Sequence, residues 1–350
     1  MTMRNNDFFA ADKRQQKLNE FTLPLKQLDA LVNWAELAAA VNLPLKRELV
    51  HAKGGRPGYP TVVMLKILVL QQLYGNLSDE ETEYALLDRL SWQQFLGLTG
   101  ALNVPDARTI WHFKNRLAHT QSSSALFAAV QAQLDCAGYQ AKGGQLIDAT
   151  IVPSPKVQLD KAEREQLKRG EVPADWSKKK AAHKDRDAHW TIKRDQAYHG
   201  YKAHINADQK HKLVRQIEVT AANQSDISQF EALLDTSAAR QAQGKTVYAD
   251  KGYQSQANRQ LLKQHGLRDG ILRKDDRSRY DQSAIRRRNQ RLSKVRARVE
   301  HIFGVWSRRG GKAVRCVGLL RATAQITVQA VAYNLRRWVS LDGGSPSFGH

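Results

Sequence analysis

QLIDATIV, residues 145–152, is the first run in the chain whose apolar and β-branched residues follow one another as they do in a buried strand. Asp148 is the one charged residue within it. A charge in such a run is costly to bury unless it is paired or bound to a metal ion. The run therefore predicts a strand, with Asp148 either in a core ion pair with an arginine or at a functional site.

The elements expected after this strand predict a mixed sheet flanked by helices. Further strands are expected at 198–207, 213–220, 245–249 and around 271–272, the first two joined as a hairpin. Helices are expected at 226–239, 255–265, 283–308 and 323–339. Strand, hairpin, helix, strand, helix, strand and helix is the element order of an α/β fold of the ribonuclease H-like kind.

The chain before this sheet is expected to form an all-helical N-terminal module. Its apolar residues recur at helical spacing from residue 61, and Ser78 followed by Glu81 is a capping box. Glycine and proline punctuate residues 54–60. The expected organisation is an N-terminal helical arm (1–53), a helical DNA-binding or dimerisation module (54–140), a catalytic domain (141–340) with a basic insertion (155–196), and a tail (341–350).

The charge of the chain favours nucleic acid as its partner. It has 55 Lys and Arg against 34 Asp and Glu, a formal net charge of +21. Such a field attracts a polyanion, and the affinity should fall steeply with salt. The N-terminal residues lack the apolar core of a signal peptide, and no run is long enough to cross a membrane. We expect a cytoplasmic, DNA-binding protein without a membrane partner.

A dense group of cations in the helix expected at 283–308 is the predicted DNA contact. A solvated charged face is the alternative, but like charges this close repel one another, and phosphate would relieve the repulsion. Lys202, on the expected hairpin, is a further candidate phosphate contact. The helix contributes Arg286, Arg287, Arg288, Arg291, Lys294, Arg296 and Arg298.

Two further acids join Asp148 as candidates. Asp250 closes the strand expected at 245–249, although Asp before Lys-Gly is also ordinary in a turn. Glu300 lies on the flank of an amphipathic helix, where it and Arg296 could simply be an exposed ion pair. Three carboxylates from separate elements suit two Mg²⁺ or Mn²⁺ ions roughly 4 Å apart, which would activate an attacking hydroxyl and stabilise the leaving oxygen.

The three segments around these acids resemble the signature blocks of bacterial insertion-sequence transposases of the Asp-Asp-Glu (DDE) type, in particular the insertion-sequence-five family. Further similar segments lie at 56–60, 105–110 and 198–204, so the resemblance spans about residues 55–340. The three blocks are IDAT (147–150), VYADKGY (247–253) and RARVEHIFG (296–304).

The resemblance implies catalytic and metal-binding roles for Asp148, Asp250 and Glu300, and it gives Arg296 the place of the family's arginine one turn before the glutamate. Relatives often carry tyrosine and lysine where this chain has Ser293 and Ser307. Arg308 could replace the missing lysine as a contact to DNA.

The implied activity is cleavage of DNA at the inverted-repeat ends of an insertion sequence, followed by joining of the 3′-hydroxyl ends to target DNA. A homodimer is expected because two ends must be cut together. Two alternatives stay open, a nuclease on the same fold that does not join strands and a DNA-binding regulator without catalysis.

Two interpretations concern residues outside the expected site. Cys136 and Cys316 lie in unrelated segments and are each expected to be a small buried hydrophobe. Trp306 could stack on a base, but a core position is favoured because it shares the apolar side of its helix.

Overall fold

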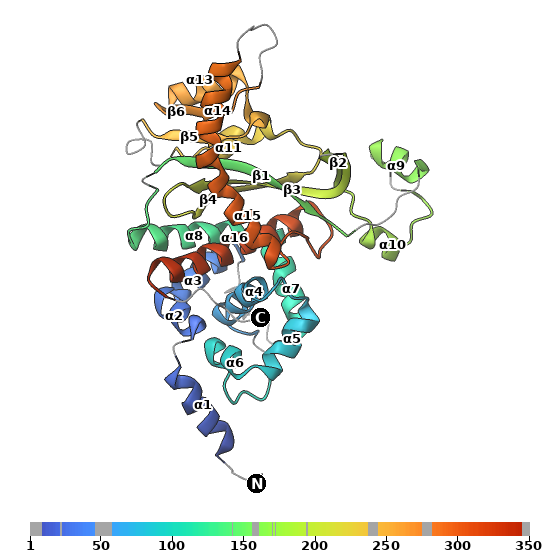
Figure 1. The fold of residues 1–350 in the computed structure, drawn as a ribbon. Helices are drawn as coiled ribbons and strands as arrows, with labels where there is room; N and C mark the ends of the chain where they lie inside the picture. The colour runs from blue at the N-terminus through green and yellow to red at the C-terminus, as the bar shows by residue number, and fades with distance from the viewer. Residues whose placement is uncertain are drawn as a thin grey trace, which may run out of the picture.

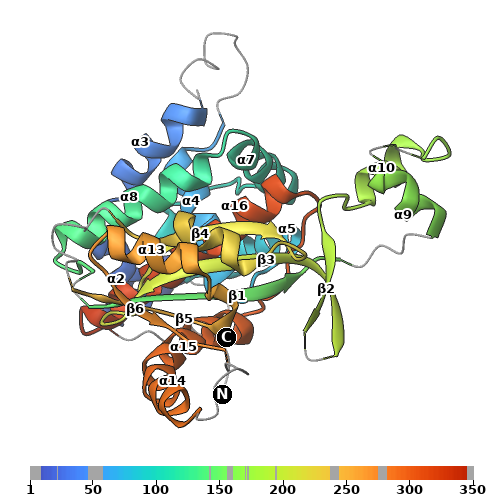
Figure 2. The same cartoon turned by 90° about the horizontal axis from the view of Figure 1, so that it is seen from above.

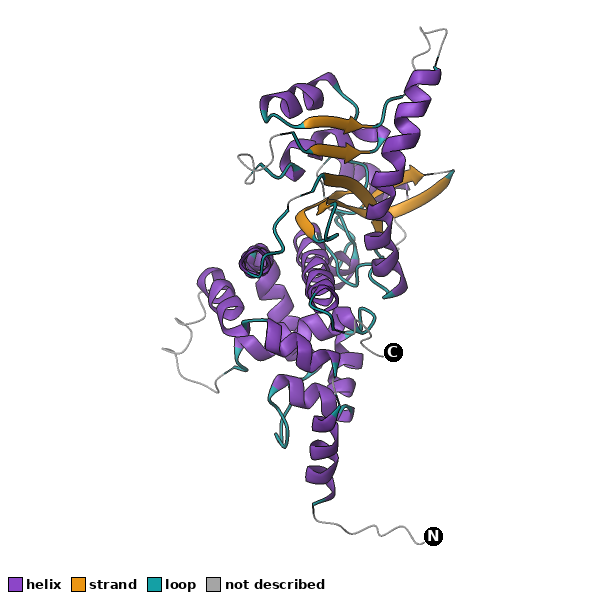
Figure 3. Cartoon of the chain, turned by 60° about the vertical axis from the view of Figure 1, so that its left-hand side comes forward, coloured by secondary structure: helices purple, strands orange, loops and turns teal. Residues whose placement is uncertain are grey.

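A six-stranded mixed sheet forms the centre of the C-terminal half in the computed structural model of the chain (Figure 1). The strands lie together above a cluster of helices (Figure 3). The structure describes residues 9–21, 23–45, 58–141, 143–155, 161–169, 171, 173–193, 195–236, 244–274 and 282–344.

The sheet has the order β2-β3-β1-β5-β6, with β4 paired to β3 beyond the part that β2 covers. β1 is antiparallel to β3 and parallel to β5, and β5 is parallel to β6. The expectation of a mixed sheet flanked by helices is therefore confirmed. The strands are β1 (Gln145–Pro153), β2 (His189–Lys193), β3 (Gln196–Asp208), β4 (Val214–Ala221), β5 (Thr246–Ala249) and β6 (Arg268–Ile271).

Both faces of the sheet are covered, which is why β1 is apolar on both sides. Ile147 packs with residues of α11 (Phe230–Leu233) and α13 (Gln256–Gln264) on one face. Leu146 belongs to the larger core on the other face, with Val299 and Ile302. Figure 2 shows α13 and α14 on opposite sides of the strands.

The opposite face carries a helical run that begins with α14 (Ser283–Arg296). It continues through the 3₁₀ turn η4 (Ala297–Val299) into α15 (Glu300–Arg308). The expectation of one continuous helix at 283–308 is wrong at η4. Val299 in this turn is fully buried in the core that contains Leu146, so the irregular turn lies where the run meets β1.

The region before the sheet is helical, as expected. Ser78 and Glu81 form the capping box of α5, and the Asp106 side chain accepts from Thr109 N at the start of α7. The helices are α1 (Ala10–Glu20), α2 (Pro24–Leu31), α3 (Trp34–Leu45), α4 (Thr61–Leu73), α5 (Asp79–Asp88), α6 (Leu90–Leu96), α7 (Ala107–His119) and α8 (Ser122–Cys136).

The last long helix, α16 (Leu319–Leu341), links this region to the sheet. It packs against α2, α4, α7 and α8 and also against β4. The buried Asn334 side chain accepts from Val214 N and donates to Val214 O, at 2.9 and 2.8 Å, and so satisfies backbone groups at the edge of β4. Residues from both ends of the chain therefore share one hydrophobic core.

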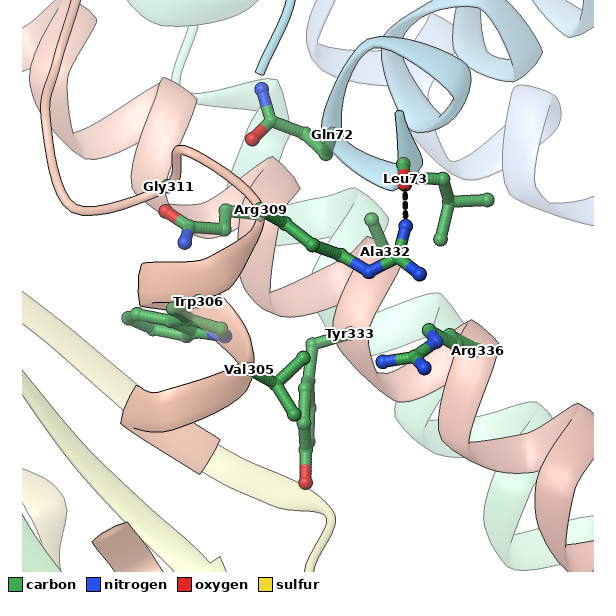
Figure 4. A pocket seen from close by; sticks show the side chains of 10 residues that line it. Gln72, Leu73, Val305, Trp306, Arg309, Gly311, Ala332, Tyr333 and Arg336 are labelled. Atoms are coloured by element: carbon green, nitrogen blue, oxygen red, sulfur yellow. Dashed lines mark hydrogen bonds between the residues drawn. The ribbon is translucent and has the colours of Figure 1, made fainter. Parts of the chain in front are cut away.

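A second link joins the end of α15 to the end of α4. Figure 4 shows the Arg309 side chain donating to the carbonyl oxygen of Leu73, beside a cavity of about 20 Å³ that Trp306 and Tyr333 help to line. Trp306 is only 2% exposed, so its expected core position is confirmed.

Only part of the segment expected as an N-terminal arm packs against the rest of the molecule. α1 extends away from the rest of the molecule (Figure 1). Leu28 of α2 and Leu37 and Val41 of α3 are fully buried in the main core. The residues at 46–53 lie outside the described part of the chain.

The range expected as a basic insertion contains α9 (Lys161–Lys168), α10 (Lys178–His183) and the edge strand β2. Its own small core forms around Trp176, whose indole nitrogen donates to Glu163 at 2.9 Å. Glu163 also forms an ion pair with Lys184 at 3.4 Å. These contacts give this mostly polar segment a folded centre.

Two further expectations are corrected. The helix expected at 226–239 is a 3₁₀ turn, η2 (Asp226–Gln229), followed by the four-residue α11, and residues 237–239 lie outside the described part. Cys136 is exposed rather than buried, because it is the last residue of α8; Cys316 is partly buried. No helix among the described residues combines the length and apolar character needed to cross a membrane.

Candidate active site

Asp148 in β1 and Asp250, directly after β5, come to neighbouring positions at the end of the β1–β5 pairing. In the parallel pairing of β1 with β5, Leu146 is opposite Tyr248 and Ile147 is opposite Ala249, so the next position on each side is an aspartate. Neighbouring strands are about 4.8 Å apart, and residues in register point to the same face. This pairing directs both carboxylates toward the face on which Leu146, Tyr248 and α15 pack.

Asp148 is the more enclosed of the two acids, with 17% of its side chain exposed. Its Oδ1 accepts from Ala149 N at 2.9 Å, and its Oδ2 accepts from Arg296 Nη1 at 2.7 Å. Burial raises the pKa of Asp148 to about 6, with a further increase from the charge of Asp250, although Arg296 and the Ala149 amide oppose the shift. Burial therefore outweighs the contact with Arg296, and the folded protein disfavours ionisation of this carboxylate.

Glu300 is the first residue of α15, directly after the 3₁₀ turn. Its side chain is 64% exposed and forms an ion pair with Arg296, 3.4 Å between Oε1 and Nη2. Arg296, the last residue of α14, contacts Asp148 through its other terminal nitrogen. A single guanidinium thus connects two of the three acids that the sequence singled out.

The three carboxylates fit Mg²⁺ or Mn²⁺ in their donor chemistry, since hard divalent cations prefer oxygen ligands. Strand register brings Asp148 and Asp250 to neighbouring positions, and Asp148 is enclosed, with Arg296 as its ion-pair partner. In this conformation no three acidic, histidine or cysteine side chains of the described residues lie close enough to hold a metal ion. The register of β1 and β5 brings the two aspartates to neighbouring positions, whereas Glu300 is turned to Arg296.

Most of the cations expected to contact DNA lie on one side of α14 and η4. Arg286, Arg287, Arg291, Lys294 and Arg298 are all exposed, and their spacing places them within an arc of about 140° on a helix. Ile285, on the other side of α14, is buried. The exposed Arg308, at the end of α15, lies further along the same helical run.

Arg288 and Lys202, also expected to contact DNA, are engaged within the protein. Arg288 donates to the carbonyl oxygens of Ile271 and Asp269 at 2.9 and 2.8 Å, which ties α14 to β6. Burial lowers the pKa of Arg288. Lys202 is paired with Asp226 at 2.9 Å and donates to Gln224 O at 2.8 Å.

Two residues near the acids were not singled out from the sequence. The pKa of Tyr253 is raised first by burial and then by the charges of Asp226, Asp148 and Asp250, which places its hydroxyl in the same acidic neighbourhood. Lys193 of β2 lowers the pKa of Asp148. Tyr253 belongs to the VYADKGY block, which was a usable signal; nothing in the sequence near Lys193 indicated its position.

Two known families match this chain. The family described as Transposase DDE domain matches residues 139–335, more than half of the chain, and this range includes Asp148, Asp250 and Glu300. The family described as Transposase domain (DUF772) matches residues 10–116, most of the helical region. These two matches carry the family assignment.

One solved structure is also similar to this chain, a cryo-EM structure of the piggyBac transposase synaptic complex with hairpin DNA. The identity is 11% and the TM-score 0.40, with 95% of this chain and 78% of that chain covered.

Proposed function

Because the chain belongs to the family of transposases with a DDE domain, we propose that it cuts DNA at the inverted-repeat ends of an insertion sequence and joins the freed 3′-hydroxyls to target DNA. The order of the strands supports a catalytic domain of the ribonuclease H-like kind, with β1 central, the β3–β4 hairpin on one side and parallel β5 and β6 on the other. The three sequence blocks favour the insertion-sequence-five family of bacteria.

Asp148, Asp250 and Glu300 are the proposed ligands of two Mg²⁺ or Mn²⁺ ions. The observation that carries this proposal is the register of β1 and β5, which brings two acids separated by about a hundred residues to neighbouring positions. When bound, such ions lower the pKa of an attacking water or 3′-hydroxyl and stabilise the leaving oxygen of the phosphodiester.

The residues around this pair prepare it for that task. Burial of Asp148 strengthens its electrostatic interaction with a cation, because few water molecules compete. Glu300 supplies the third carboxylate from α15. Its exposure leaves its side chain free to turn toward the aspartates, and loss of its contact with Arg296 costs little.

The exposed arc of α14 is the proposed DNA surface, with Arg286, Arg287, Arg291, Lys294 and Arg298 neutralising phosphates. Arg308 would extend this surface along α15. The helical module at 54–140 is proposed to bind transposon ends or to dimerise. An activity on chromosomal DNA would place the protein in the bacterial cytoplasm, in association with the nucleoid, as a homodimer when two ends are paired.

A strand-transfer assay with paired end-containing DNA and Mg²⁺ tests the proposal. A transposase yields joined product, whereas a nuclease on the same fold yields nicked substrate alone. The matched control is Asp148→Asn, which removes one charge and keeps the shape of the side chain. If cleavage by the purified Asn variant equals that of the wild type, Asp148 is not a catalytic ligand. If the wild type binds DNA but cleaves none in Mg²⁺, the chain is a DNA-binding regulator and its acids are structural.

A further inference from the structure

Arg296 lies between two of the three proposed metal ligands and faces inward. Its Nη1 donates to Asp148 at 2.7 Å and its Nη2 to Glu300 at 3.4 Å. Its side chain is 19% exposed, and its buried Nε has no hydrogen-bond partner among the residues that the structure describes. Two residues further on, Arg298 is exposed on the turn η4. The guanidinium of Arg296 is therefore withdrawn from the surface that the other cations of α14 form.

The metal-free site needs a cation at this position. Asp148 of β1 and Asp250, directly after the parallel strand β5, occupy neighbouring positions, so two negative charges meet there. Arg296 is in direct contact with Asp148, at 2.7 Å, and the Asp148 side chain is only 17% exposed. Removing the partner of a buried charge is strongly destabilising, so this guanidinium holds the site together when no metal ion is bound.

The guanidinium of Arg296 and a metal ion would compete for the same carboxylate. A divalent cation on Asp148 would compete for the carboxylate oxygen that Arg296 now contacts, and the two positive charges would repel each other. The planar, forked guanidinium matches a phosphate as well as it matches a carboxylate. When a metal ion displaces Arg296 from Asp148, a phosphate at the site could therefore accept hydrogen bonds from the freed guanidinium.

We infer that Arg296 is the internal counter-ion of the metal-free site, and that divalent cations binding to Asp148 transfer its guanidinium from the carboxylates to a DNA phosphate. This inference rests on the proposed metal site. Arg296 is then a positioning residue with two alternative partners, and it makes DNA affinity depend on metal occupancy.

The first test measures Mg²⁺ affinity by titration calorimetry of the full chain. Arg296→Gln should bind Mg²⁺ more tightly than the wild type by about tenfold, within the usual range for coupled sites, because no guanidinium competes for the carboxylate. Arg298→Gln is the matched control, since it removes the same charge from an exposed position close by, and should leave the affinity unchanged.

The second test measures binding of a DNA duplex with either a chelator or Ca²⁺ present. Arg296→Gln should bind DNA as the wild type does in the chelator, where Arg296 is occupied by Asp148, and should bind more weakly in Ca²⁺. Arg298→Gln should weaken binding to the same extent in both conditions. A merely structural role for Arg296 would not produce this dependence on the cation.

Equal Mg²⁺ affinity in the wild type and Arg296→Gln, or an equal loss of DNA affinity in both conditions, would overturn the inference and leave the proposed function intact. If neither the wild type nor any variant binds Mg²⁺, the proposed metal site fails and the inference fails with it. Should Arg296→Gln not fold, Arg296→Lys replaces it. Lysine keeps the charge without the fork, so its Mg²⁺ affinity should lie between those of wild type and glutamine.

Discussion

The aspartates and the glutamate of the proposed site are held in different ways. Asp148 and Asp250 are placed by strand register, and Asp148 is enclosed. Glu300 lies at the start of a helix, mostly exposed, with one ion pair to fix it. The comparison teaches that strand register fixes the positions of the two aspartates, whereas the glutamate, the third proposed ligand, lies exposed at the start of a helix and can adjust. Changes to the two parts should therefore differ in their effects on activity, stability and DNA binding.

Removing one charge from the pair of aspartates should have the largest effect. Asp148→Asn and Asp250→Asn should each reduce the cleavage rate on the order of a thousandfold or more, because neither remaining set of ligands can hold both ions. DNA affinity in chelator should change little. The measurement is cleavage of a labelled duplex in Mg²⁺, with filter binding as the control. Substantial cleavage by either variant would contradict the assignment.

The enclosed aspartate should also impose a pH-dependent cost on stability. The pKa of Asp148 is raised to about 6 in the folded protein, so the folded state binds its proton more tightly than the unfolded state. Its contribution to stability is therefore present at low pH and is lost as pH rises from about 4 to about 6. In metal-free protein near pH 8, Asp148→Asn should be more stable by about 3 kcal/mol.

Urea denaturation at several pH values checks this prediction. The difference between Asp148→Asn and wild type should shrink toward zero near pH 4. A variant that is less stable than wild type at every pH would show that the Arg296 contact outweighs the burial of Asp148.

The cations of α14 offer the same contrast between exposed and enclosed groups. Arg291→Ala should weaken DNA binding several-fold at low salt and reduce the slope of log affinity against log salt by about one. Arg288→Ala should instead lower the free energy of unfolding by roughly 1–3 kcal/mol, because it leaves the carbonyl oxygens of Ile271 and Asp269 without their donor. A salt titration and a denaturation curve of each variant separate the two outcomes.

The smallest expected effect is the change in the free energy of unfolding when Glu300, the adjustable ligand, is replaced. Glu300→Gln should change the free energy of unfolding of metal-free protein by no more than about 0.5 kcal/mol, since its ion pair is exposed. The same variant should nevertheless lose most cleavage activity. A large loss of stability would show that Glu300 is fixed as firmly as Asp148.

The sequence was sufficient to predict the strand around Asp148 and the position of Asp250, because local patterns determine them. An apolar run containing one acid and an acid directly before a turn are both visible without knowledge of distant residues. The capping box of α5 was predictable for the same reason, since its two residues are three positions apart.

Features that depend on distant contacts could not be predicted. Lys202 looks free in the sequence, but the fold brings Asp226 to it. The 3₁₀ turn at Ala297–Val299 contains neither proline nor glycine, and it occurs where Val299 packs against the core below β1. The packing of α2 against the molecule involves α16, a helix almost three hundred residues later in the chain.

The pleat of β5 has a consequence for changes of chain length. Alternate residues of a strand face opposite sides, so inserting or deleting one residue between Thr246 and Ala249 would send Asp250 to the side where α13 packs, away from Asp148. Adding two residues would restore its direction but displace it along the strand. The connections around this strand can therefore vary in length, whereas the length of β5 itself can change only by an even number of residues if Asp250 is to face the same side.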